Sequence, residues 1–198
     1  NFAYIFEVSE AETIAMGYTP ENKDDFIETV QIEAPTQSAP IVCIMDSGVQ
    51  EEHKYLAPSI SSDESISLLP NNTSTSDEVA GGGHGTRVAG AVLYPKAVPL
   101  DGVYQLPCWI RNMRILDENN CLPESVYPPK AIAIAVQKYN VENQIPTKIF
   151  NHSIGSHRPC EMKHMTPWAA EIDSQSYNHD VLFIQAAGNI SKIGRAHV

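Results

Sequence analysis

Basic residues are scarce in this chain. Over 198 residues, 13 Lys and Arg stand against 24 Asp and Glu, which gives a formal net charge of −11. Proteins that bind phosphate backbones or anionic lipid depend on Lys and Arg to neutralise those surfaces. We therefore expect no nucleic acid partner. Apolar runs are also short, and none reaches the ~18 residues needed to cross a bilayer, so no membrane partner is expected.

Cysteine is sparse as well. The four cysteines are Cys43, Cys108, Cys121 and Cys160. They are unevenly spaced and form no Cys-x-x-Cys pair, which argues against a zinc ribbon and a disulfide framework. Cys160 and His164 lie four residues apart, near His152 and His157, but two ligand types without a second pair are weak grounds for a metal site. We expect no metal and no cofactor, and a buried thiol at Cys43, which sits in an apolar run.

Short β-branched apolar runs alternate with helical patterns from residue 41 onward. The expected strands are 41–45, 110–116, 148–150 and 181–184. The expected helices are 85–93, 125–140 and 168–177, the last one following a Thr166-Pro167 cap. Strands that are apolar on both faces suit a buried parallel sheet. The pattern predicts an α/β fold with a mostly parallel sheet and helices on both faces.

The first 39 residues differ from the rest. A strand-like run at 2–6 is followed by a polar stretch and by a breaker cluster at 34–40. This composition predicts an N-terminal extension and linker over 1–39, followed by one domain over 40–198. Within that domain, residues 59–78 are rich in Ser, Asp, Asn and Thr, so we expect a surface excursion there.

Two polar motifs carry chemistry. Asp46 ends the first expected strand, and His84 follows three glycines, 38 residues later, at the start of an expected helix. Polar residues that follow parallel strands meet at the carboxyl edge of the sheet. A carboxylate that orients an imidazole, which in turn takes the proton of a serine hydroxyl, is the machinery of one class of hydrolase, in the chain order Asp, His, Ser. We therefore interpret Asp46 and His84 as a catalytic pair.

The surrounding residues strengthen this interpretation. Segment 41–49 (IVCIMDSGV) resembles the aspartate motif of the subtilisin-like serine proteases, the subtilases, and 83–90 (GHGTRVAG) resembles their histidine motif. Segment 151–155 (NHSIG) is similar to their substrate-binding segment, and 185–189 (QAAGN) to the segment with the oxyanion-hole asparagine. The four motifs occur in the family's order and cover residues 41 to about 190.

The resemblance implies a subtilisin-like fold and a serine endopeptidase that hydrolyses peptide bonds without a cofactor. Asp46 would orient His84, which would act as general base and then as general acid. Asn189 would donate its amide hydrogens to the oxyanion. The implied peptide-binding residues are Ser153, Ile154 and Gly155. An extended peptide would lie against them as an added strand, so peptide or protein substrates are the expected partners.

The sequence also departs from the family pattern. Arg87 stands where a second histidine is usual, and Tyr55 stands where many members have an aspartate ligand for calcium, so we expect no calcium there. The family's Gly-Thr-Ser-x-Ala turn does not occur before Val198. We therefore expect a domain truncated at its C-terminus, with the nucleophilic serine beyond Val198. Such a fragment would be inactive by itself and would self-associate through uncovered apolar surface.

Two alternatives remain open. The motif Asn151-x-Ser153-x-Gly155 superficially resembles a nucleophile elbow, but that turn needs glycine on both sides of the serine, and Asn151 breaks the signature. The other alternative is a catalytically dead subtilase-like scaffold that serves as a peptide-binding or interaction module. The joint presence of Asp46, His84 and Asn189 argues against it, because a binding module needs neither a general base nor an oxyanion donor.

Overall fold

The central element is a five-stranded sheet in which every pairing is parallel, with the order β3-β5-β2-β6-β7. Its strands are β2 (Ile41–Asp46), β3 (Ile66–Ser67), β5 (Trp109–Arg114), β6 (Ile149–His152) and β7 (Leu182–Gln185). The computed structural model describes residues 30–80, 83–155 and 165–186. Four of the five strands lie within two residues of the predicted ones, and the parallel sheet is confirmed.

Strand β2 is buried on both faces of the sheet, as is typical of a central strand in a parallel sheet. Val42 and Ile44 pack on one face and Cys43 and Met45 on the other, and all four side chains are buried. A strand covered on both faces needs helices above and below the sheet. Cys43 is a free thiol with no exposed surface, as expected from the sequence.

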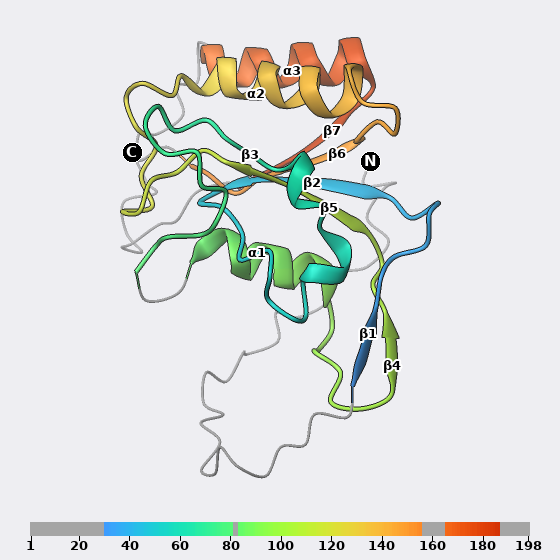
Figure 1. Cartoon of the computed structure of the whole chain (residues 1–198). Helices are drawn as coiled ribbons and strands as arrows, with labels where there is room; N and C mark the ends of the chain where they lie inside the picture. Colours follow the sequence, from blue (N-terminus) through green and yellow to red (C-terminus); the bar gives the residue numbers. More distant parts are fainter. Residues whose placement is uncertain (1–29, 81–82, 156–164, 187–198) are drawn as a thin grey trace, which may run out of the picture.

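Helices cover both faces, which confirms the predicted fold class. The helix α1 (His84–Leu93) lies on one face, and α2 (Pro128–Val136) and α3 (Pro167–His179) lie together on the other (Figure 1). A π-helical turn, Gln137–Val141, continues α2. None of the helices in the described ranges is long and apolar enough to span a membrane.

The helix ends follow local rules. The Thr166 side chain accepts a hydrogen bond from the Ala169 backbone N–H, and Pro167 occupies the first helical position of α3, as predicted. The helix predicted over 125–140 begins only at Pro128. Tyr127 has an extended backbone (ψ 117°) because proline disfavours the helical conformation in the residue before it.

A second, two-stranded parallel sheet was not predicted. It pairs β1 (Gln31–Glu33) with β4 (Val103–Gln105) and extends away from the central sheet (Figure 1). Strands of three residues offer too few positions for an alternating pattern to be visible. The pairing ties the end of the predicted extension to the rest of the structure, whereas the strand-like run at 2–6 lies outside the described residues.

The prediction of a surface excursion over 59–78 is wrong in part. This stretch contains the short helix η2 (Ser62–Glu64) and β3, and it begins at the last residue of η1 (Ala57–Ser59). Ser59 and Asp77 are buried. Polar residues can be buried when they are hydrogen-bonded, so composition alone did not reveal which members of this stretch enter the interior.

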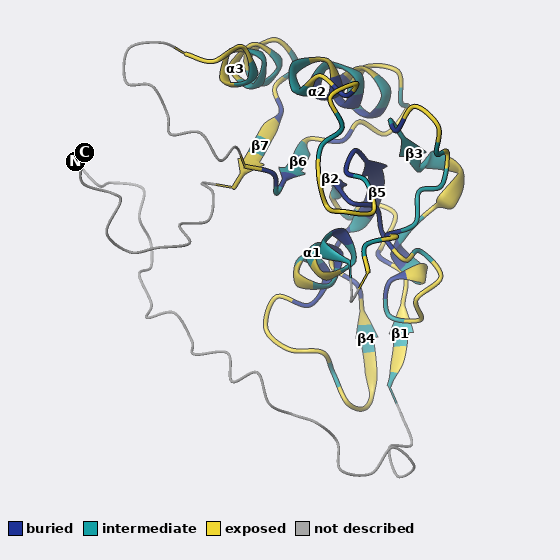
Figure 2. Ribbon diagram, turned by 90° about the vertical axis from the view of Figure 1, so that its left-hand side faces the viewer, coloured by how far each residue is buried: buried dark blue, intermediate teal, exposed yellow. Residues whose placement is uncertain are grey.

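Burial falls off toward β7 (Figure 2). Leu182 and Ile184, which share one face of this strand, are 58% and 50% exposed. Phe183 points to the opposite face and stacks on Phe150, with 5.2 Å between ring centroids. Within the described residues, β7 pairs with β6 alone and is an edge strand whose one face is apolar and uncovered.

Candidate active site

The carboxyl ends of the parallel strands lie along one edge of the sheet, where the predicted site residue Asp46 and the predicted binding segment 153–155 are found. Asp46, His152 and Gln185 are the last residues of β2, β6 and β7. The register pairs Met45 with His152 and His152 with Gln185, so these strand ends are neighbours. The segment 153–155 begins at the same edge, directly after β6.

Asp46 and His84 are in contact. The Nδ1 atom of His84 lies 2.9 Å from each carboxylate oxygen of Asp46. Asp46 has no exposed surface, whereas 44% of the His84 side chain is exposed. The second ring nitrogen, Nε2, has no hydrogen-bond partner among the described residues. The pair therefore holds one nitrogen against a buried carboxylate and leaves the other available to a reactant.

Burial sets the electrostatics of the pair. Removal from water raises the pKa of Asp46, while the hydrogen bonds from His84 and from the Ser47 backbone N–H, 2.7 Å from Oδ1, act in the opposite direction. A buried carboxylate gains most when its partner carries a positive charge, because the surrounding dielectric is low. The contact thus holds Nδ1 of His84 against an acceptor that is removed from water.

A relay of polar groups anchors the first turn of α1, which carries His84. The N-cap residue is Gly83, which has no side chain to accept a hydrogen bond. The Ser47 hydroxyl instead accepts from the Gly85 N–H at 2.9 Å and donates to Asp77 at 3.1 Å. The other Asp77 oxygen accepts from the N–H of Thr86 at 3.0 Å and from its hydroxyl at 2.9 Å. These bonds satisfy helix N–H groups that would otherwise lack partners.

Sequence reasoning missed Asp77. It lies seven residues before His84, inside the stretch that was predicted to be a surface excursion. One signal was present: a helix that begins after Gly83 has no side-chain cap of its own, so a polar residue from another segment has to supply it. Its burial follows from the four donors that surround it, which include the Val79 backbone N–H at 3.4 Å.

Close backbone approach requires glycine at two positions of the site. Gly48 has a φ of +97°, and a Cβ there would lie 2.5 Å from the Thr75 carbonyl oxygen. Gly85 packs against the end of β2, and a Cβ there would lie 2.2 Å from the Gly48 carbonyl oxygen and 3.1 Å from the Cβ of Asp46. Any side chain at Gly85 would separate α1 from β2, and with them His84 from Asp46.

The predicted peptide-binding segment lies beside this pair along the edge. The Ser153 hydroxyl donates to Asn151 Oδ1 at 2.6 Å, and it bonds no histidine among the described residues. Ile154 is buried in the core, whereas Gly155 is exposed. Asn189 lies outside the described residues, so the structure does not place the predicted oxyanion donor; the described chain reaches Ala186, whose N–H donates to the His152 carbonyl at 3.2 Å.

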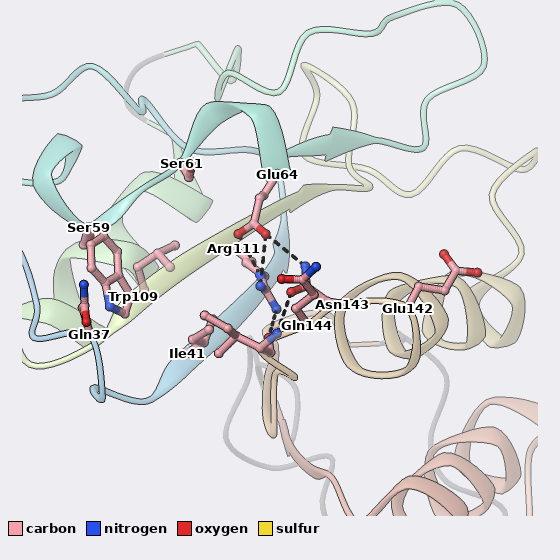
Figure 3. Close-up of a pocket in the computed structure, with 12 residues that line it drawn as sticks. Gln37, Ile41, Ser59, Ser61, Glu64, Trp109, Arg111, Glu142, Asn143 and Gln144 are labelled. Carbon is pink, nitrogen blue, oxygen red and sulfur yellow. Dashed lines mark hydrogen bonds and ion pairs between the residues drawn. The ribbon is translucent and has the colours of Figure 1, made fainter.

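The opposite edge of the sheet holds a hollow of about 450 Å³ (Figure 3). Ile41 and Trp109, the first residues of β2 and β5, line it together with Glu64 and Arg111. It is therefore separated from Asp46 by the length of a strand. No group of three or more His, Cys, Asp or Glu side chains in the described part of the chain is arranged to hold a metal ion.

Comparison with known protein families identifies the family of this chain. The model of the subtilase family matches residues 37–197. The chain belongs to the subtilase family. Membership supports a serine peptidase function in general, and the motifs quoted from the sequence lie within the matched region. The search of curated proteins gave no match.

A solved structure shows the same fold. The subtilase chain resembles the crystal structure of the Aeromonas sobria serine protease (ASP) in complex with its chaperone (ORF2), with a TM-score of 0.52 and 16% sequence identity. The match covers 76% of the present chain and 25% of the protease chain. At this identity the likeness speaks for the fold alone, and the present chain spans about a quarter of that protein.

Proposed function

We propose that this subtilase chain supplies the Asp–His half of the active site of a serine endopeptidase. The observation that carries the proposal is the contact of Asp46 with His84 Nδ1 at 2.9 Å, on a residue whose side chain is 44% exposed. A structural ion pair has no need to keep one ring nitrogen open to solvent at the edge of a parallel sheet, where ligands bind in folds of this kind.

The chemistry follows from the tautomer that this contact selects. A carboxylate only accepts hydrogen bonds, so Nδ1 of His84 carries the proton and Nε2 is the base. Nε2 would take the proton of a serine hydroxyl as the oxygen attacks the peptide carbonyl, and would then deliver it to the departing amine. Asp46 would stabilise the imidazolium between these steps. Asn189 would donate to the oxyanion, an interaction worth about 10²–10³ in turnover.

The nucleophile would come from sequence beyond Val198. The Gly-Thr-Ser-x-Ala turn of the family does not occur in these 198 residues. By this proposal the chain binds peptides as an added strand along 153–155 but does not hydrolyse them by itself. The hydroxyl of Ser153 is engaged by Asn151, which favours a binding role for this residue over a nucleophilic one.

Covalent labelling with a fluorophosphonate, read by intact mass, tests the proposal. The 198-residue chain would be compared with the complete chain, by which we mean the gene product that includes this sequence and continues past Val198. We expect one adduct on the complete chain and none on the 198-residue chain. Absence of label on both would transfer support to the catalytically dead scaffold.

Two variants of the complete chain make the result specific. His84→Ala should abolish labelling, because the serine loses its base. Ser153→Ala should label as the unmodified chain does; loss of its label would instead identify Ser153 as the nucleophile of an elbow.

We further propose that the 198-residue chain self-associates. The support is the edge strand β7. On one of its faces, Leu182 is 58% exposed and Ile184 is 50% exposed. Apolar side chains grouped on an edge strand favour association with a second chain. Light scattering tests this, and a monomer at micromolar concentration that binds no dye for exposed apolar surface would contradict it.

A further inference from the structure

His152 and Gln185 lie in two of the quoted motif segments, and the structure joins them as a cross-strand pair at the carboxyl edge that the motifs did not predict. They are directly opposite each other at the ends of β6 and β7. His152 Nδ1 lies 2.6 Å from Gln185 Oε1. His152 is 1% exposed, and its ring meets the Trp168 ring of α3 edge to face, with 5.1 Å between centroids. The imidazole is thus fixed from two sides.

The amide end of Gln185 continues the connection. Its Nε2 donates to the carbonyl of Ile154, and also to the carbonyl of Ala186 at 3.1 Å. Because Nε2 serves as the donor, Oε1 faces His152, and His152 Nδ1 must carry a proton. Burial lowers the pKa of His152, so the ring is neutral at neutral pH with that single proton directed at Gln185.

This connection determines which backbone groups a peptide could use. The carbonyl of Ile154, the middle residue of the predicted binding segment, is already occupied by Gln185. A peptide that adds as a strand would therefore pair with the backbone groups of Ser153 and Gly155. The same side chain holds Ala186, the last described residue on the path to Asn189.

We infer that His152 and Gln185 are positioning residues that hold the peptide-binding segment 153–155 against β7. The inference rests on the proposed peptidase function, because it assigns those residues to substrate binding. The two side chains act as a unit: His152 orients the Gln185 amide, and the amide fixes the Ile154 carbonyl. Neither touches the reacting atoms.

Kinetics of the complete chain test the pair, with enzyme concentrations taken from fluorophosphonate titration. Gln185→Leu should raise KM for a tetrapeptide anilide about tenfold, in line with the loss of a buried hydrogen bond, while kcat changes less. A single-residue ester does not reach along the segment, so its KM should stay within about twofold. Gln137→Leu is the matched control, since Gln137 is an exposed glutamine that bonds Glu142 at the end of α2.

The histidine side of the pair gives a rescue test. His152→Leu should reproduce the KM increase, whereas His152→Gln retains a donor for Gln185 and should restore KM to within about threefold. The double variant His152→Leu/Gln185→Leu should be no worse than either single variant, as expected for two residues that act through one connection.

The outcomes separate the two proposals. If the unmodified complete chain labels and hydrolyses, but Gln185→Leu behaves like Gln137→Leu, the positioning role is overturned and the peptidase function stands. Equal losses for the anilide and the ester also overturn it, because they indicate a general loss of folding. If the unmodified complete chain neither labels nor hydrolyses, the peptidase function is overturned and the positioning role falls with it.

Discussion

Two side-chain pairs at opposite edges of the same sheet are hydrogen-bonded in opposite ways. At the amino edge, all three guanidinium nitrogens of Arg111 are bonded. Two bond Glu64 at 3.0 and 3.1 Å (Figure 3). The third bonds Thr147 Oγ1 at 2.8 Å and the carbonyls of Tyr139 and Ile145. At the carboxyl edge, His84 uses one nitrogen on Asp46 and leaves the other open. Arg111 thus has all three guanidinium nitrogens engaged, whereas His84 keeps one ring nitrogen without a partner among the described residues, as the proposed proton transfer requires.

The largest expected effect breaks the carboxyl-edge pair. His84→Ala in the complete chain should lower kcat for peptide hydrolysis about 10⁴-fold or more, because the general base is removed. The free energy of unfolding should fall by about 1–3 kcal/mol, because the buried Asp46 loses one of its hydrogen-bond partners, so the fold is retained while kcat is lost. Steady-state kinetics and urea unfolding measure the two quantities. Retention of more than a few per cent of kcat would rule out His84 as the base.

Removal of the Arg111–Glu64 pair should have the opposite effect, with a loss of stability and little change in kcat. Arg111→Met should destabilise the fold by about 3 kcal/mol, because Glu64 and two buried acceptors, the Tyr139 carbonyl and Thr147 Oγ1, lose their donor. The kcat of the molecules that remain folded should stay within about twofold. Glu64→Gln, which keeps an acceptor for the guanidinium, should cost only about 1 kcal/mol. A kcat loss in Arg111→Met comparable to that of His84→Ala would erase the contrast between the two edges.

Two glycines of α1 sharpen the comparison within one helix. Gly85→Ala should destabilise by about 1–3 kcal/mol, because its Cβ would overlap the Gly48 carbonyl. It should also lower kcat about 10²-fold, since a small displacement of α1 moves His84 away from Asp46. Gly90→Ala is the matched control, as a Cβ there meets nothing within 4 Å. That variant should gain about 0.5–1 kcal/mol of stability, and an equal loss in both variants would contradict the packing argument.

The smallest effect concerns pH. Burial lowers the pKa of His152 below its ordinary value of 6.5, so the unfolded chain binds this proton more readily than the folded one. Stability from this residue is complete above about pH 6.5 and is lost as the pH falls below it, with a slope of at most about 1.4 kcal/mol per pH unit. The Glu64 pKa is lowered from 4.5 by its bonds to Arg111 and Asn143, although burial opposes them, so stability from Glu64 is lost only below about pH 4.5.

Urea unfolding at several pH values separates these contributions. Between pH 6.5 and 4.5, His152→Gln should show a flatter decline in stability than the unmodified chain, and Glu64→Gln should not. Asp46 acts in the opposite direction, because burial raises its pKa and acidification relieves the cost of its buried charge. Both proteins contain Asp46, so its contribution cancels when the free energy of unfolding of His152→Gln is subtracted from that of the unmodified chain at each pH. Parallel pH profiles would show that His152 does not resist protonation.

The sequence predicted the parts of the fold that have a strong local signature. The short β-branched apolar run at 41–45 suited a strand buried on both faces, and Thr166-Pro167 marked the start of α3 through rules that involve adjacent residues. The strands β1 and β4 were not predicted, because each has only three residues and forms by pairing with a segment 72 positions away. The role of Asp77 was not predicted either. Its burial depends on donors from Ser47 and Thr86, which come together only when β2 and α1 pack against each other.

The site was predictable to a similar extent. Asp46 and His84 stood in motifs whose spacing placed them at one sheet edge, and the structure brings them into contact. The link from His152 through Gln185 to Ile154 was not predicted, because it depends on the register of β6 against β7. The register of two strands is set by how their side chains pack across the sheet, so it cannot be read from the sequence of either strand alone.

The anchoring of α1 by Asp77 has an electrostatic consequence. The N-terminal end of a helix carries roughly half a positive charge from its aligned peptide dipoles, which opposes a cation placed at the first turn. His84 is the first residue of α1, and in the proposed mechanism it would become a cation when it takes the serine proton. The Asp77 carboxylate, bonded to the Thr86 N–H at the same helix end, supplies negative charge where the dipole is positive. The helix would thus tolerate an imidazolium in its first turn, where its own dipole would otherwise oppose a positive charge.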